Sequence, residues 1–440
     1  MKILNRKILA LAVPSIIANI TTPLLGLVDT AITGHLDSEI YLAAIALGAS
    51  MFNILYWPFA FLRMGTSGMT AIAFGAKNTG QQSLILYRGL LVGLLASVII
   101  IAAASPLCDL LLWFMKADES TALLTRQYFR LVVWGAPAVL LTYVLTGWFL
   151  GMQSSRRPMV ISIVINTVNI AISPVLAFSL GMKFTGVAIG TLTAQWTGLI
   201  VGLVMCRKYA LATPCRSKIL NLSELKRYFT VNRDIFLRTL CLIAVTMWFT
   251  REGARQSDVM LAVNALLMQL FILFSYMIDG FAFAGEALTG RFVGSGNYRA
   301  LKKCIRSLMK WGISLAVIYS LVYFVAGEGI LSVLTDNYHV KEIARDYLPW
   351  AVTIPLCGFL AFIWDGIYIG ATATRGMLLS MVGAMIVFFG SYFLLFPVMH
   401  NHGLWLAFLL YLLSRGLFQT LLFGRFFPAP GNVIKNHSHH

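Results

Sequence analysis

Charged residues are scarce in this 440-residue chain, and acidic residues are the scarcest. Only 12% of the residues are charged, and Asp and Glu together number 17, whereas soluble domains carry about 25% charged residues. Hydrophobic residues make up 59% of the chain. This composition excludes a soluble enzyme and a disordered chain, and it indicates a protein that lies mostly within a membrane.

The sequence also lacks the usual signatures of catalytic and metal sites. Its six cysteines form no Cys-x-x-Cys pair, so neither a metal site nor a disulfide scaffold is predicted. It has no Walker motif, which excludes direct use of ATP by this chain. No Ser/His/Asp or Cys/His set can be assembled, because His35, His339, His400 and His402 fall in or near predicted outer loops. We therefore expect no enzyme activity, no bound metal and no cofactor.

Twelve long apolar runs, separated by polar loops, account for most of the chain. A helix needs about 20 residues to cross the hydrocarbon of a bilayer, and the chain is long enough for twelve such spans. The predicted spans are residues 8–33, 41–68, 89–106, 122–147, 159–180, 186–205, 233–252, 259–286, 308–326, 345–369, 378–398 and 404–424. The expected fold class is therefore an all-α polytopic membrane protein with twelve transmembrane helices.

The basic residues are distributed unevenly over the loops. The chain has 34 Lys and Arg and a formal net charge of +17, and most of this charge lies on the side that holds both termini. The opposite loops carry only Lys116, Lys183, Arg255 and Lys341. By the positive-inside rule both termini are expected in the cytoplasm. The distribution of positive charge therefore indicates the topology of the chain, and it also predicts some attraction to anionic membrane lipid. It does not indicate a nucleic-acid partner.

An internal repeat relates the two halves of the chain. Gly34, Gly75 and Gly151 each follow or end a predicted span, and similar sequence recurs around Gly253, Gly294 and Gly370, always 219 residues later (for example 294 − 75 = 219). Six spans separate the copies, so both halves have the same orientation and form a parallel repeat. The predicted organisation is an N-terminal six-helix lobe (1–205), a cytoplasmic linker (206–232), a C-terminal six-helix lobe (233–424) and a cytoplasmic tail (425–440). Two such bundles are typical of a transporter in which one half rocks against the other.

Polar residues follow single helical faces in the first half. In the first span the spacing of 4, 3, 4, 3 and 4 puts six residues on one face, namely Ser15, Asn19, Thr22, Gly26, Asp29 and Thr33. Small residues such as Ser15 and Gly26 are also typical of a helix packing seam. Asp29 differs from these, because a charge within a span costs about 2.5–3.5 kcal/mol on insertion scales. We therefore expect Asp29 to face a cavity or a partner.

The fifth and sixth spans carry a matching set of neutral polar groups. Ser162, Asn166, Asn169 and Ser173 are again spaced by 4, 3 and 4, and the sixth span adds Thr191 and Gln195. Their oxygens, with the carboxylate of Asp29, suit a hard cation such as Na⁺ or a proton held on the carboxylate. Ordinary hydrogen bonds between helices explain the same pattern equally well. We take the residues of the substrate cavity to be Asn19, Thr22, Thr33, Asn166 and Gln195.

The second half has intramembrane charges of its own. Asp279 and Glu286 share one face of the eighth span, and Asp365 and Tyr368 share a face of the tenth. The candidate partners for these acidic groups are Arg63, Arg238 and Arg415. A coupling role and a set of buried salt bridges that stabilise the bundle are both consistent with this pattern.

Four segments resemble the multidrug and toxic compound extrusion (MATE) transporters, and within them the DinF-type branch. The most specific segment is 13–36, which contains Pro14 and Asp29; the others are 61–78, 279–286 and 365–372. The resemblance implies two six-helix lobes around a central cleft and efflux driven by entry of H⁺ or Na⁺. It also implies coupling roles for Asp29, Asn169 and Thr191, and a first helix that can kink at Pro14.

One position departs from the family pattern. Many relatives carry an Asp four residues after the asparagine that corresponds to Asn169, whereas this chain has Ser173. The loss of that carboxylate disfavours a tight Na⁺ site and leaves Asp29 as the membrane carboxylate of the first half.

The expected function is therefore a proton-coupled antiporter, acting as a monomer in a bacterial inner membrane, that exports amphipathic and often cationic compounds. Asp29 would be the coupling carboxylate. The alternatives are a Na⁺-coupled multidrug antiporter and a lipid-linked saccharide flippase of the same superfamily. A flippase would need a strongly cationic cavity, and the polar faces of the first half contain no Lys or Arg. A membrane-embedded enzyme or receptor is disfavoured by the repeat and by the missing catalytic set.

Overall fold

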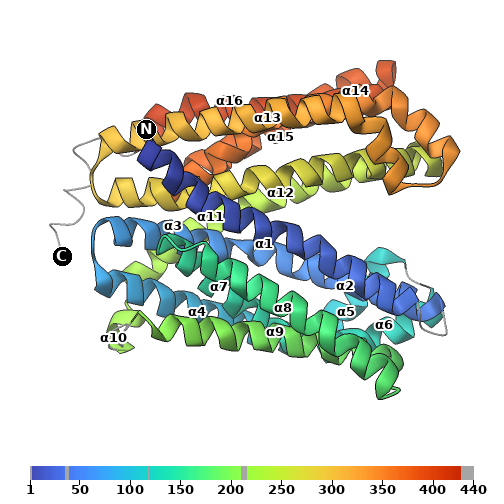
Figure 1. The fold of residues 1–440 in the computed structure, drawn as a ribbon, viewed down its shortest axis with the longest axis horizontal. Helices are drawn as coiled ribbons and strands as arrows, with labels where there is room; N and C mark the ends of the chain where they lie inside the picture. Colours follow the sequence, from blue (N-terminus) through green and yellow to red (C-terminus); the bar gives the residue numbers. More distant parts are fainter. Residues whose placement is uncertain (1, 35–38, 117, 210–215, 428–440) are drawn as a thin grey trace. The chain divides into compact units, whose positions relative to one another are not determined.

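The computed structural model describes residues 2–34, 39–116, 118–209 and 216–427; the side chains of residues 22–34, 39, 216, 222 and 227 also lie outside the described part. Within these ranges the chain is helical and contains no strand (Figure 1). The helices are α1 (Lys2–Gly34), α2 (Glu39–Tyr56), η1 (Trp57–Ala60), α3 (Phe61–Gly75), α4 (Thr79–Ala102), α5 (Ala104–Met115), α6 (Glu119–Val132), η2 (Val133–Gly135), α7 (Ala136–Gly151), α8 (Arg156–Pro174), η3 (Val175–Ser179), α9 (Lys183–Arg207), α10 (Arg216–Ile219), α11 (Leu222–Gln256), α12 (Asp258–Gly294), α13 (Tyr298–Leu334), α14 (Tyr338–Gly370), α15 (Thr374–Met399) and α16 (Asn401–Phe426).

The predicted spans all lie on helices. Of the described chain, eleven helical stretches are long and apolar enough to cross a membrane. The remaining predicted span, 233–252, lies within α11, which is long enough, but the span carries five charged residues: Arg233, Asp234, Arg238, Arg251 and Glu252. Most helices extend beyond the predicted spans, because hydrogen bonding of the helix continues after the apolar run has ended. The protein is therefore an all-α, multi-pass membrane protein.

The offset of 219 residues holds for whole helices. The stretch from the start of α2 to the end of α3 covers residues 39–75, and α12 covers residues 258–294, so both ends differ by 219. The stretch from the start of α6 to the end of α7 (119–151) differs from α14 (338–370) by the same number. The helix caps repeat as well. Asn78 and Asn297 cap α4 and α13 through bonds of 3.0 Å to Gln81 N and Ala300 N.

A second pair of caps repeats with a change of residue. Asp118 caps α6 and Asn337 caps α14, each by accepting a bond from the backbone N–H three residues later. Hydrogen bonds from Ser120 and Thr121 lower the pKa of the Asp118 carboxyl to about 2. An ionised Asp118 therefore caps α6 at any physiological pH, as the neutral Asn337 does for α14.

The two copies differ in the continuity of their helices. A 3₁₀ turn with Pro58 separates α2 from α3, whereas α12 runs unbroken through the equivalent position, Met277 (277 − 58 = 219). A proline lacks the backbone donor that a helix interior requires. A turn at Ala103 likewise separates α4 from α5, while the equivalent α13 is continuous. The predicted third span, 89–106, therefore extends past the end of α4 and into the first residues of α5.

The chain packs as two compact units. The N-terminal unit is Ile17–Phe229, and the C-terminal unit is Thr230–His440 together with Met1–Ile16. These boundaries differ from the expected lobes (1–205 and 233–424). The start of α1 belongs to the C-terminal unit because Ile8 and Ala12 are buried there and Gly280 of α12 leaves room for the Ala12 carbonyl. Pro14 lies inside the continuous helix α1, two residues before the boundary.

The expected linker, 206–232, is more helical than predicted and packs on the N-terminal unit. It contains α10 and the first turns of α11, while residues 210–215 lie outside the described chain. The buried Arg88 of α4 donates to the carbonyls of Lys218 (2.7 Å) and Ile219 (3.2 Å) at the end of α10. Tyr228 bonds to Thr66 at 3.1 Å. These contacts anchor the linker to the N-terminal unit.

Candidate functional site

A line of small residues on α9 sets the distance between α8 and α9, which lie side by side in the N-terminal unit (Figure 1). Gly186, Gly190, Gly198 and Gly202 are spaced by multiples of four, so they share one face of the helix. A side chain at Gly190 would meet the Cα of Ser173 at 2.8 Å. The glycines thus let the two helices approach closely enough for short polar side chains to meet between them.

Three of the predicted coupling residues come together at this crossing. Asn169 Nδ2 donates to Thr191 Oγ1 at 3.1 Å, and Ser173 lies one helical turn further along α8. Asn169 is 1% exposed and Ser173 0%. The Asn169 Oδ1 and Ser173 Oγ atoms have no hydrogen-bond partner among the described residues. The crossing therefore holds two buried polar oxygens that are free to accept a proton donor or to bind a cation.

Asn166, predicted to line the substrate cavity, instead joins α8 to α1. Its Nδ2 donates to the Thr21 carbonyl at 2.8 Å, and Ser162 Oγ lies 3.1 Å from Thr21 Oγ1. Sequence reasoning missed Thr21, which lies outside the 4, 3, 4 pattern. These contacts are of the kind that ordinary hydrogen bonding between helices predicts, and the cavity role of Asn166 stays a prediction.

The remaining predicted cavity residues are only partly placed. Asn19 on α1 and Gln195 on α9 are half-buried. Gln195 Oε1 lies beside Gly135, at the start of α7, and has no hydrogen-bond partner among the described residues. The side chains of Thr22, Asp29 and Thr33 lie outside the described part, although the α1 backbone is helical through all three positions.

The C-terminal unit holds a charged cluster built on Asp365 of α14. Arg238 of α11 and Arg415 of α16 both donate to Asp365 Oδ2, as the sequence predicted for these two arginines. Gln419 Nε2 donates to Asp365 Oδ1 at 2.6 Å. The four side chains are buried: Arg238 is 6% exposed, Arg415 3%, Asp365 6% and Gln419 0%.

The other predicted residues of this unit lie around that cluster. Tyr368 is fully buried and its hydroxyl donates to the Gln419 carbonyl at 2.6 Å. Asp279 of α12 acts electrostatically on both arginines. Glu286 lies two turns further along α12, where its backbone packs against Gly370 at the end of α14. Gln419 was missed, although it follows Arg415 by four residues and therefore shares its helix face.

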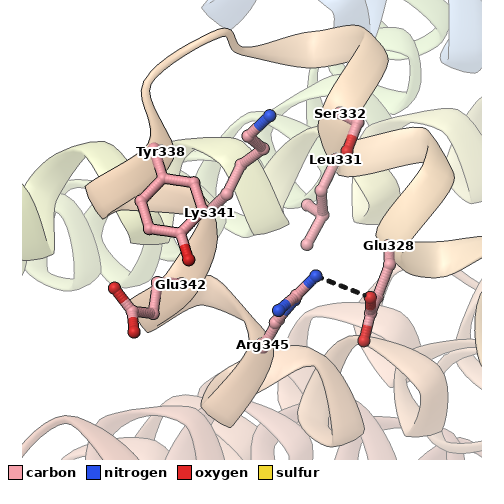
Figure 2. Close-up of a pocket in the computed structure, with 7 residues that line it drawn as sticks. All are labelled: Glu328, Leu331, Ser332, Tyr338, Lys341, Glu342 and Arg345. Carbon is pink, nitrogen blue, oxygen red and sulfur yellow. Dashed lines mark ion pairs between the residues drawn. The ribbon is translucent and has the colours of Figure 1, made fainter.

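Two surface pockets are related by the repeat and contain none of the predicted site residues. Figure 2 shows the pocket in the C-terminal unit, where Glu328 of α13 faces Arg345 of α14 across a 2.9 Å ion pair. Its counterpart contains Asp109 and Arg126, paired at 2.8 Å. The pocket in the C-terminal unit encloses ≈ 80 Å³ and its counterpart ≈ 690 Å³, so only the first is smaller than the volume of about 300–1,000 Å³ that drug-sized ligands need. Both ion pairs are exposed, so we regard them as contacts that hold neighbouring helix ends together.

Comparison with known proteins assigns the family. The MatE family model matches residues 14–175 and 234–394, which is one match in each copy of the repeat. The chain is also 37% identical over 418 residues to the DNA damage-inducible protein F of Escherichia coli (strain K12), covering 94% of this chain and 91% of that protein. The chain belongs to the MATE family. Members of this family are transporters of small molecules and not enzymes.

More distant relatives share the fold and much of the length. The chain is 20% identical over 368 residues to the multidrug export protein MepA of Staphylococcus aureus (strain bovine RF122 / ET3-1), covering 83% of this chain and 81% of that protein. The crystal structure of the Vibrio cholerae MATE transporter VcmN in the bent form superposes with a TM-score of 0.86 at 16% identity, over 96% of this chain and 97% of that one. The resemblance noted in the sequence is thus confirmed at the level of family and fold.

Proposed function

We propose that this MATE protein is a proton-coupled antiporter that exports amphipathic, often cationic compounds across a bacterial inner membrane. Its relationship to a protein named for multidrug export supports the substrate class. Its 37% identity to the Escherichia coli protein supports a bacterial membrane, and the excess of Lys and Arg on one side supports cytoplasmic termini. The two units would move against each other during transport, as expected for a parallel repeat.

The crossing of α8 and α9 carries the proposal for coupling. The buried Asn169 and Ser173 each present an oxygen without a partner among the described residues. Thr21 of α1 is level with Ser162 and Asn166 of α8, and the contacts advance in the same direction along both helices. Since each helix rises 1.5 Å per residue, position 29, eight residues after Thr21, comes level with position 174, eight after Asn166. This register supports a role for Asp29 next to Ser173.

Protonation of Asp29 would remove its charge and change how it bonds to these oxygens. Proton binding and drug binding would then compete within one unit, which is the requirement for antiport. Neutral oxygens also suit Na⁺, so a Na⁺-coupled antiporter is the second candidate. Ser173 disfavours it, because a serine supplies no charge to balance the cation.

Transport by reconstituted protein tests both candidates. Proteoliposomes loaded with ethidium should export it when a pH gradient is imposed, and a Na⁺ gradient alone should have no effect. Asp29→Asn should abolish ethidium-driven proton release while the protein remains folded and inserted. Asp109→Asn is the matched control, because it removes a carboxylate of the same unit that forms an exposed ion pair. Wild-type export by the Asp29→Asn variant would show that another group couples transport.

A further inference from the structure

Two arginines share one acceptor in the interior of the C-terminal unit. Both guanidinium groups reach the same oxygen of Asp365, while its other oxygen accepts from Gln419. The Nε atoms of Arg238 and Arg415 are buried and have no hydrogen-bond partner among the described residues. The two guanidinium groups therefore share one carboxylate oxygen and keep Nε donors that no described residue accepts.

The first half of the chain has no counterpart of this charged cluster. Subtracting 219 from 238, 365, 415 and 419 gives the equivalent positions, which are Asn19, Thr146, Trp196 and Ile200. None of the four is charged, and two of them, Trp196 (39%) and Ile200 (57%), are exposed. Burying ions costs several kcal/mol each, and replacing them by apolar residues is often neutral or stabilising. The cluster is thus specific to the C-terminal unit, and ligand binding would explain why that unit keeps charges which are costly to bury.

The surroundings of the cluster are aromatic. The Arg415 guanidinium lies 5.7 Å from the centre of the Phe362 ring, and Phe362 contacts Phe271 and Phe274. The other polar groups close to the arginines are Asp279 and Tyr411, and the Tyr411 hydroxyl is bonded to Met381 Sδ at 3.1 Å. Paired guanidinium groups next to aromatic rings match an acidic head group on an apolar body.

We propose that Arg238 and Arg415 form a binding site for organic anions, in which Asp365 occupies the place of the ligand's carboxylate or sulfonate when no ligand is bound. An incoming anion would take over the two guanidinium groups, and its aromatic or aliphatic body would contact the phenylalanines. The proposal goes beyond export of cationic compounds, since it gives the protein a second substrate class and assigns that class to the C-terminal unit.

Binding of a matched pair of ligands to the purified full-length protein tests the site. 2-Naphthoate and 2-naphthamide have the same shape and differ in charge. We expect the Kd of 2-naphthoate to be at least about ten-fold lower, the difference that about 1.4 kcal/mol of charge-assisted bonding provides. Equal Kd values for the two ligands would overturn the proposal.

Variants separate the site from a structural ion cluster. Arg415→Gln should raise the Kd of 2-naphthoate about ten-fold and leave that of 2-naphthamide unchanged. Arg345→Gln, which removes the same charge from an exposed pair, should change neither. Asp365→Asn should lower the Kd of 2-naphthoate, because it removes the internal competitor, whereas loss of a structural ion pair would weaken binding of both ligands alike. Where Arg415→Gln does not fold, Arg415→Lys keeps the charge and loses the planar fork, and should still weaken 2-naphthoate binding selectively.

Ethidium transport by the same preparations separates this proposal from the proposed function. Normal ethidium–proton antiport together with equal binding of the two naphthyl ligands would overturn the anion site alone. Selective 2-naphthoate binding without any response of ethidium export to a pH gradient would overturn the proposed coupling and support the anion site.

Discussion

A single methyl group at Gly190 should separate α8 and α9, the two helices that carry the proposed coupling site. Gly190 is buried on α9 and faces α8. An alanine Cβ there would lie 2.8 Å from the Cα and 3.0 Å from the Cβ of Ser173, closer than van der Waals contact allows. Because the Cα belongs to the backbone, no side-chain rotation can relieve the clash. The helices must move apart, and the 3.1 Å bond between Asn169 and Thr191 should lengthen with them.

The expected magnitude follows from two opposing effects. Overpacking a tight interior costs about 1–3 kcal/mol, while replacing glycine by alanine within a helix gains up to about 1 kcal/mol. Gly390 of α15 isolates the second effect, because it has no neighbour within 4 Å. Gly390→Ala should therefore be neutral or stabilising, and Gly190→Ala should be less stable than Gly390→Ala by about 1–3 kcal/mol.

Thermal melting in detergent, followed by tryptophan fluorescence, measures this difference. Gly190→Ala should melt several degrees below Gly390→Ala and should also show slower proton-driven ethidium export in proteoliposomes. If the two variants melt together and transport equally well, α8 and α9 do not form the close crossing that brings Asn169, Ser173 and Thr191 together.

Three further changes test other parts of the N-terminal unit. Thr191→Val leaves the buried Asn169 amide without its acceptor, which costs about 1–3 kcal/mol. The Thr191→Val variant should therefore melt at a lower temperature than Thr193→Val, because the Thr193 hydroxyl donates to the Ile189 carbonyl of its own helix. Equal melting temperatures of the two variants would contradict the pairing of Asn169 with Thr191. Ser173→Asp restores the second carboxylate of the family pattern and should make binding or transport Na⁺-dependent; an unchanged cation dependence would locate coupling elsewhere. Pro14→Ala should straighten α1 and slow transport without weakening ethidium binding, and a wild-type rate with the same pH dependence would exclude bending of α1 from the cycle.

The repeat made the fold predictable from the sequence. Apolar runs of membrane length separated by polar loops indicate helices, and the constant offset showed that the second half copies the first. The boundaries of the two packed units were not predictable in the same way. A helix such as α1 reads as one apolar run, and nothing in that run shows that its first sixteen residues pack with Thr230–His440.

The sequence predicts which side of α8 the candidate site residues share, but it does not predict the groups to which they bond. The 4, 3, 4 spacing placed Asn166, Asn169 and Ser173 on one side of α8, and the structure confirms that all three are buried there. Which group each one bonds depends on the helix that crosses at its level. Asn166 meets the backbone of Thr21 and Asn169 meets Thr191, and helix periodicity carries no information about that crossing.

The two halves of this transporter use one helical frame for two kinds of chemistry. Adding 219 to 169 and 173 gives Phe388 and Tyr392, so aromatic rings fill the C-terminal unit where the N-terminal unit places Asn169 and Ser173. In the opposite sense, Asn19 and Thr146 stand in the N-terminal unit where Arg238 and Asp365 meet in the other. Each polar set is therefore present in one unit only. Neutral oxygens at a close helix crossing suit a small cation or a hydrogen bond from a protonated carboxyl group, whereas paired arginines suit an anion. The two copies of the duplicated fold therefore differ in their polar groups, which is consistent with the proposed coupling site in one unit and the proposed anion site in the other.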